Sequence, residues 1–265
     1  MSKQYFLPLL LVLLFSCNQP ASWEQVNYIE LEGISPIGLV LQEGNFWIAD
    51  GDNNRLVQLA SDGTILSTID GFERPMHLAE ANGRLYIPEY GADQITVLED
   101  TTRSIYPVKE KMDAPAGVAV YDKELGIVDF YNHRVLFFNG SDWIIFGQKG
   151  KEDGAFDYPT DLHIGDDKIY IADAYNNRVQ VFNKKGQHLL TFGEAEEMNA
   201  ATGLTVYDDR VFVTDFENDR IMIYTLEGQF IQAIDEVPKP IDVLFDQNKL
   251  YVAHFQDKAI GVYKQ

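Results

Sequence analysis

Apolar and polar positions alternate in a pattern that repeats along the chain and is clearest at residues 169–182, which read IYIADAYNNRVQVF. The run begins with four uncharged residues that are mostly β-branched or aromatic, as is typical of a buried strand. Asp173 ends this run, and Asn176 and Asn177 tolerate the backbone angles of a tight turn. From Arg178 onward polar and apolar residues alternate with the period of a half-buried strand. The stretch therefore predicts a strand, a short polar loop and an antiparallel partner.

Imperfect copies of this stretch fill most of the chain. The residue that ends the strand recurs every 39 to 44 residues, at Asp50, Glu89, Asp129, Asp173, Asp215 and His254. The fifth residue after each is Arg55, Gln94, Arg134, Arg178, Arg220 and Ala259. Five of the six copies also have a Pro-led apolar segment upstream, beginning at Pro36, Pro75, Pro115, Pro159 and Pro240. Six copies of about forty residues, each with about four strands, predict an all-β, six-bladed β-propeller.

The two ends of the repeat array are unequal. Residues 23–31 read as a strand without a full repeat behind it, whereas the sixth copy stops at residue 265, just after its third strand. A sheet edge left open at each end is unfavourable. We therefore expect residues 23–265 to form one closed propeller, with the N-terminal run as the outer strand of the last blade.

The repeat motifs resemble NHL repeats. The shared pattern is P-x-G/D-L/V, then IYIAD-x-x-NNRV-x-VF, then a Gly turn and TFG, and Phe146, Gly147, Gly150, Gly154, Phe156 and Pro159 match the usual bridge between blades. The resemblance covers about residues 23–265, and copies two and six depart from it at the Asp and Arg positions. It implies a six-bladed propeller of the NHL type.

The first residues carry a separate signal. Lys3 precedes an apolar run over residues 6–15, and this run is too short to span a bilayer, so residues 1–16 are interpreted as a signal peptide. Residues 14–17, LFSC, resemble the cleavage box of a bacterial lipoprotein. On this interpretation Cys17, the single cysteine, is lipidated and residues 17–22 form a short tether. The alternative is an ordinary signal peptide with a chance cysteine.

These signals predict a lipid-anchored protein of the bacterial cell envelope. We expect it to face the periplasm, because no acidic run beside Cys17 suggests export to the cell surface. The lipid anchor is then the only expected contact with the membrane, and the propeller is expected to be a monomer.

The charge balance restricts the choice of partner. The chain has 41 acidic and 21 basic residues, a net charge of −20, and no evident cluster of Lys and Arg. A nucleic acid would be repelled, so nucleic-acid binding is excluded. The acidity is compatible with solubility, a cationic partner or cation binding.

Candidate binding residues lie where a propeller brings its loops together. The start of each innermost strand and the end of each second strand share a face near the axis, and ligands commonly bind there. Gly is the commonest residue at the innermost-strand position, so His77, Asp161 and Asp242 break the repeat, as does His254 at a second-strand end. Imidazole and carboxylate groups are suited to a divalent cation or a polar ligand. The alternative is a solvated rim around a water-filled channel.

Aromatic residues in the loops after the second strands are further candidates, at Tyr90, Phe130, Tyr131, Tyr175, Phe216 and Phe255. They provide a stacking surface for a ligand, with Tyr131 and Tyr175 favoured, or they pack neighbouring blades together. The repeated acidic and basic residues are interpreted as structural, because most copies contain them: Asp50, Asp129, Asp173, Asp215, Arg55, Arg134, Arg178 and Arg220.

Known catalytic patterns are missing from the sequence. A peptide-amidating lyase of similar shape binds zinc through a His directly after the blade-start Pro, where this chain has Ile37, Met76, Ala116, Thr160, Thr202 and Ile241. The sequence contains no Gly-x-Ser-x-Gly or His-Glu-x-x-His motif and no phosphate-binding Gly loop.

We therefore expect a non-catalytic binding or assembly module that holds a protein, peptide or small ligand on its axial face. It needs no cofactor, apart from a candidate divalent cation. The alternative is a metal-assisted lyase or lactonase with a pocket at His77, Asp161, Asp242 and His254. A third class, a purely structural envelope protein, would have a large partner interface and no small ligand.

Overall fold

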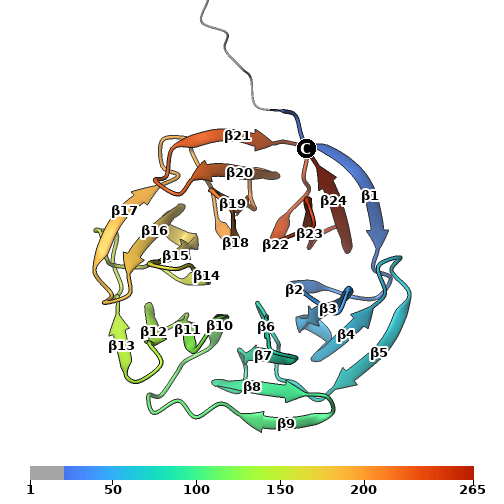
Figure 1. Cartoon of the computed structure of the whole chain (residues 1–265), viewed down its shortest axis with the longest axis horizontal. Coiled ribbons are helices and arrows are strands. Elements are labelled where there is room, and N and C mark those ends of the chain that lie inside the picture. Colours follow the sequence, from blue (N-terminus) through green and yellow to red (C-terminus); the bar gives the residue numbers. More distant parts are fainter. Residues whose placement is uncertain (1–20) are drawn as a thin grey trace, which may run out of the picture.

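A computed structural model describes residues 21–265 as a ring of six four-stranded antiparallel sheets around a central axis (Figure 1). The predicted fold class, an all-β six-bladed propeller, is confirmed. The expected signal peptide and Cys17 lie outside the described residues. Within residues 21–265 no helix is long and apolar enough to cross a membrane.

The strands follow the chain from the axis outward in each blade. The first blade contains β2 (Pro36–Gln42), β3 (Asn45–Asp50), β4 (Arg55–Leu59) and β5 (Ile65–Asp70), and the second contains β6 (Ala79–Ala81), β7 (Arg84–Glu89), β8 (Gln94–Glu99) and β9 (Thr102–Ile105). The third contains β10 (Pro115–Tyr121), β11 (Glu124–Asp129), β12 (Arg134–Phe138) and β13 (Trp143–Phe146). The fourth contains β14 (Pro159–Ile164), β15 (Lys168–Asp173), β16 (Arg178–Asn183) and β17 (His188–Phe192). The fifth contains β18 (Ala201–Tyr207), β19 (Arg210–Asp215), β20 (Arg220–Thr225) and β21 (Phe230–Ile234). The sixth contains β22 (Pro240–Asp246), β23 (Lys249–His254) and β24 (Ala259–Lys264) from the end of the chain and β1 (Glu24–Glu30) from its beginning. Short 3-10 turns, η1 (Gly51–Asn53) and η2 (Ala174–Asn176), follow the second strands of the first and fourth blades.

Strand β1 closes the ring, as the unequal ends of the repeat array predict. It lies beside β24 in Figure 1 and pairs with it antiparallel, with Glu24 opposite Lys264 and Glu30 opposite Ala259. The last blade therefore reaches four strands by joining the two ends of the described chain, and neither β1 nor β24 leaves an unpaired edge at this junction.

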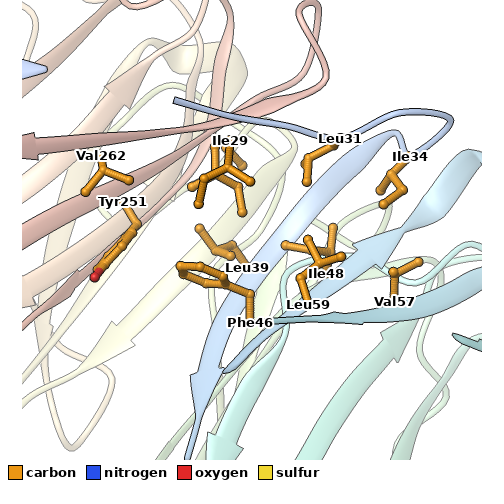
Figure 2. Packing of buried hydrophobic residues seen from close by; sticks show 12 residues of the cluster. Ile29, Leu31, Ile34, Leu39, Phe46, Ile48, Val57, Leu59, Tyr251 and Val262 are labelled. Atoms are coloured by element: carbon orange, nitrogen blue, oxygen red, sulfur yellow. The ribbon is translucent and has the colours of Figure 1, made fainter. Parts of the chain in front are cut away.

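The hydrophobic core lies between the blades. Six clusters of buried apolar residues are present in residues 21–265, and each joins two neighbouring blades. Figure 2 shows the cluster at the closing junction, where Ile29 lies near Leu39 of the first blade and Val262 of the last. Each blade thus depends on its neighbours for its core, and the ring must close to bury all six clusters.

The contribution of the closing strand is testable at Ile29, which is the one buried residue of β1. The side chain is 5% exposed, so Ile29→Ala removes packed atoms between the first and last blades and is expected to lower the free energy of unfolding by about 2–4 kcal/mol. Chemical denaturation of the full chain measures this loss. The matched control is Val26→Ala on the same strand, where the side chain is 51% exposed and the expected change is within about 0.5 kcal/mol. Equal effects of the two substitutions would contradict the proposed role of Ile29.

Candidate functional site

The repeated Asp and Arg residues form the same clamp in four blades. The Arg Nε donates to the Asp Oδ2 at 2.7–2.9 Å in the pairs Arg55–Asp50, Arg134–Asp129, Arg178–Asp173 and Arg220–Asp215. The other carboxylate oxygen accepts a main-chain N–H at 2.7–2.8 Å from the connection that enters the blade, at Ser35, Asp113, Asp157 and Asn199. In the second blade Glu89 and Gln94 make the equivalent contacts. In these five blades the side chains therefore hold the incoming connection against its blade, and this structural role uses their hydrogen-bonding groups.

Three of the predicted site residues meet at the centre of the ring. Ligand atoms of His77, Asp161 and Asp242 all lie within 4.8 Å of one another, and the side chains come from the second, fourth and sixth blades. We call these residues the axial triad. All three are buried, with 3%, 6% and 6% of the surface exposed. Because alternate blades can meet only at the axis, the triad occupies the middle of the propeller.

Glycine fills the same position in the other three blades. A Cβ on Gly38, Gly117 or Gly203 would lie 2.3–2.8 Å from a main-chain carbonyl oxygen of the next blade. The residues after those carbonyls are His77, Asp161 and Asp242, respectively. Each triad residue therefore fits at the axis because the preceding blade has no side chain there. Glycine and a triad residue alternate strictly at this position along the sequence. The three residues were predicted only because they depart from glycine, and the alternation itself was not used.

The triad also connects to the blades that follow. Asp161 Oδ2 accepts the Leu204 N–H at 2.9 Å, and Asp242 Oδ2 accepts the Leu39 N–H at 2.7 Å. The His77 main-chain N–H donates to the Ala116 carbonyl at 3.1 Å. Asp242 thus links the last blade to the first near the axis, as β1 links them at the rim.

Burial and neighbouring charge both act on the triad. Burial of the Asp161 carboxyl raises its pKa to about 7; His77 opposes this rise and the Asp242 carboxylate adds to it. Burial disfavours the charged form of His77, but the carboxylates of Asp242 and then Asp161 outweigh this effect and raise the His77 pKa. The His77 Nδ1 and Asp242 Oδ1 atoms lie 3.5 Å apart, too far for a good hydrogen bond.

His254, the fourth residue of the pocket predicted for an enzyme, is not part of this group. Its ring packs near Tyr28 of β1 and Tyr263 of β24, with centroid distances of 5.6 and 6.5 Å. The residue is fully buried, and burial lowers its pKa. His254 thus packs against the strands that close the ring.

Five aromatic side chains form a continuous surface over the second to fourth blades, on the face where the innermost strands begin. This aromatic surface consists of Tyr90, Phe130, Tyr131, Tyr158 and Tyr175. The centroids of neighbouring rings lie 4.9–5.9 Å apart, and the rings make tilted or edge-to-face contacts. The rings therefore pack across blades and still face solvent: Tyr131 and Tyr175 are 48% and 66% exposed. Tyr158 is not among the predicted aromatic residues, because it precedes an innermost strand, whereas those residues lie in loops that follow second strands.

The backbone holds these loops in place. The N–H groups of Tyr90, Tyr131 and Tyr175 donate to carbonyls of the connections entering their blades, at 3.1–3.2 Å. Two cationic groups lie against rings of this surface: the Arg74 guanidinium is 5.2 Å from the Tyr90 ring centroid and the Lys149 Nζ is 5.7 Å from that of Tyr158. The exposed tyrosines are thus presented on fixed loops.

Comparisons with known proteins agree with the architecture. Residues 156–182 match the family model of the NHL repeat. No curated protein matches the chain in sequence. The class defined by fold and motif is a six-bladed β-propeller with an NHL repeat.

Solved structures with this fold have diverse activities. A virginiamycin B lyase from Staphylococcus aureus is 14% identical, with a TM-score of 0.68 over 92% of this chain and 100% of that one. A gluconolactonase from Xanthomonas campestris is 13% identical, with a TM-score of 0.72 over 91% and 98%. A nidogen/laminin complex contains a chain that is 15% identical, with a TM-score of 0.64 over 76% and 80%. At these identities the likeness extends to the fold alone.

The requirement for glycine beside the triad gives a stability prediction. Gly117→Ala places a methyl group 2.7 Å from the Thr160 carbonyl oxygen, so we expect a loss of about 1–3 kcal/mol in the free energy of unfolding. In the control Gly165→Ala the nearest atom is 3.7 Å away, and a change within about 0.5 kcal/mol is expected. Urea denaturation compares the two, and a Gly117→Ala protein as stable as the control would show that the inner strands are not crowded.

Proposed function

We propose that this protein is an envelope-anchored, non-catalytic binding module that holds a protein or peptide partner on its aromatic surface. The observation that supports the proposal is the contact between five aromatic rings from three blades, with Tyr131 and Tyr175 exposed. Tyrosines on fixed loops provide a large contact area and lose little conformational entropy on binding. Such residues are frequent among those that dominate the energy of protein interfaces.

The path of β1 is consistent with an anchor on the opposite side of the ring. Glu24 pairs with Lys264, at the end of β24 farthest from the loops that carry the aromatic surface. The Ala21 carbonyl accepts a hydrogen bond from Gln265 at 2.9 Å, so the described chain starts at that same far end. If Cys17 carries a lipid, the tether leaves the propeller on the face away from the aromatic surface. The aromatic surface is then directed away from the membrane.

The charge of the chain favours a basic partner. A net charge of −20 attracts cationic segments over the range of the Debye length, and lysine or arginine side chains bind well over tyrosine rings. We therefore infer a partner with a positively charged, extended segment rather than an acidic one or a nucleic acid.

The alternative function, a metal-assisted lyase or lactonase, would need a substrate to reach the axial triad. The three side chains are 3–6% exposed, and His254 is not grouped with them. The aromatic surface, by contrast, is open to solvent. The geometry therefore favours binding over catalysis.

The proposal predicts that the exposed tyrosines determine partner capture. In the full chain expressed in its own host, Tyr131→Ser and Tyr175→Ser are each expected to weaken retention of a co-purifying envelope protein by about 10-fold or more, because each removes a contact ring. Quantitative mass spectrometry of the captured proteins measures the change. Raising the salt concentration is expected to weaken capture further.

The matched control is Tyr207→Ser. Tyr207 is 45% exposed and stacks on Phe245, and it ends β18 on the opposite face of the ring. This substitution is expected to leave capture unchanged. A partner lost equally from all three variants, or from none of them, would refute the assignment of the aromatic surface.

A further inference from the structure

The axial triad combines three side-chain ligands that suit one cation. It supplies an imidazole nitrogen and two carboxylates from three separate blades, with ligand atoms within 4.8 Å of one another. Donor atoms bound to one ion at about 2.0–2.6 Å lie no more than about 5 Å apart, so small shifts of the side chains would suffice to complete the coordination.

A second observation concerns His77 itself. Its Nδ1 is buried and has no hydrogen-bond partner within residues 21–265. The residue is 3% exposed, and this nitrogen lies 3.5 Å from Asp242 Oδ1, so it faces the triad. A buried polar atom without a partner is unfavourable and calls for an explanation, such as an ion or water that occupies the space.

The carboxylates also have coordination capacity to spare. Asp161 Oδ2 and Asp242 Oδ2 each accept a main-chain N–H from the following blade, and Asp242 Oδ1 accepts that of Val243. A carboxylate has about four lone-pair sites, so both groups can still bind a cation while they keep these bonds. The same bonds orient the carboxylates, which is the usual role of the groups that surround metal ligands.

We propose that His77, Asp161 and Asp242 hold one divalent transition-metal cation on the propeller axis. An imidazole nitrogen beside two carboxylates favours Zn²⁺ or Mn²⁺ over Mg²⁺ and Ca²⁺, which prefer oxygen ligands alone. The ion neutralises two neighbouring buried carboxylates and gives the His77 nitrogen a partner. Its role is structural, because it bridges the second, fourth and sixth blades beneath the surface of the axial face. The proposal is independent of the aromatic surface.

The test uses the full chain, stripped with a chelator and then titrated separately with Zn²⁺, Mn²⁺, Ca²⁺ and Mg²⁺. Elemental analysis is expected to find one Zn²⁺ per chain after removal of excess metal. Calorimetry is expected to give tighter binding for Zn²⁺ than for Mn²⁺, with Mg²⁺ weakest. At saturation with Zn²⁺, thermal unfolding is expected to shift upward by about 5–10 °C.

Two variants assign the site. Asp161→Asn and Asp242→Asn keep an oxygen that can accept the main-chain N–H and remove one charge, so each is expected to weaken Zn²⁺ binding about 10-fold or more. The control is Asp153→Asn, because Asp153 and His188 form a similar His–carboxylate contact of 3.7 Å at the surface. This control is expected to bind Zn²⁺ as the wild type does.

Three results would overturn the proposal. The first is that the wild-type protein binds no cation stoichiometrically and that none of the four metals changes its unfolding temperature. This outcome is measured on the wild type alone, so it does not depend on whether a variant folds. The second is Zn²⁺ binding that survives both triad substitutions. The third is that Asp153→Asn weakens Zn²⁺ binding as much as the triad substitutions do. The Tyr131→Ser and Tyr175→Ser proteins are expected to keep the metal, so the site and the proposed binding function can fail separately.

Discussion

Crowding of the innermost strands around the axis is the constraint on which the rest of the structure depends. Each blade meets the next there in one of two ways. At three junctions a glycine, Gly38, Gly117 or Gly203, lets the next blade approach its backbone. At the other three, His77, Asp161 or Asp242 is tied by a hydrogen bond to the blade that follows. The two kinds of contact alternate around the ring. The six innermost-strand positions therefore bring three polar side chains together at the axis.

This arrangement gives one face two regions of different character. The polar groups nearest the axis are buried and held by the main chain, whereas the aromatic rings farther out keep part of their surface in water. The Asp–Arg clamps of the third and fourth blades hold the connections at Asp113 and Asp157, and the carbonyls of these two residues accept the N–H groups of Tyr131 and Tyr175. A rigid centre would suit the binding surface proposed for the periphery, because loops that are already ordered lose little entropy on contact with a partner.

Much of the fold could be predicted from the sequence, because the repeat has a clear period and each copy encodes the same strands. The spare strand at residues 23–31 also indicated how the ring closes. The site could be predicted only in part. His77, Asp161 and Asp242 were identified because they replace the common glycine. That their side chains come together depends on the number of blades and on the alternation of glycine with these residues around the ring. Tyr158 was missed because it precedes an innermost strand, so its contacts with Phe130 of the third blade and Tyr175 of the fourth follow from the folded ring and not from its place in the repeat. His254 was included because its burial against Tyr28 of β1 and Tyr263 of β24 leaves no local signal in the sequence.

The central claim is that three alternate blades share one cation at the axis. The most direct measurement is an anomalous difference map from crystals of the full chain grown with Mn²⁺ and measured at the manganese absorption edge. Our account predicts a single peak on the axis, bonded to the His77 imidazole and to oxygens of Asp161 and Asp242. An axis without a peak, with His77 Nδ1 donating directly to the Asp242 carboxylate, would contradict it.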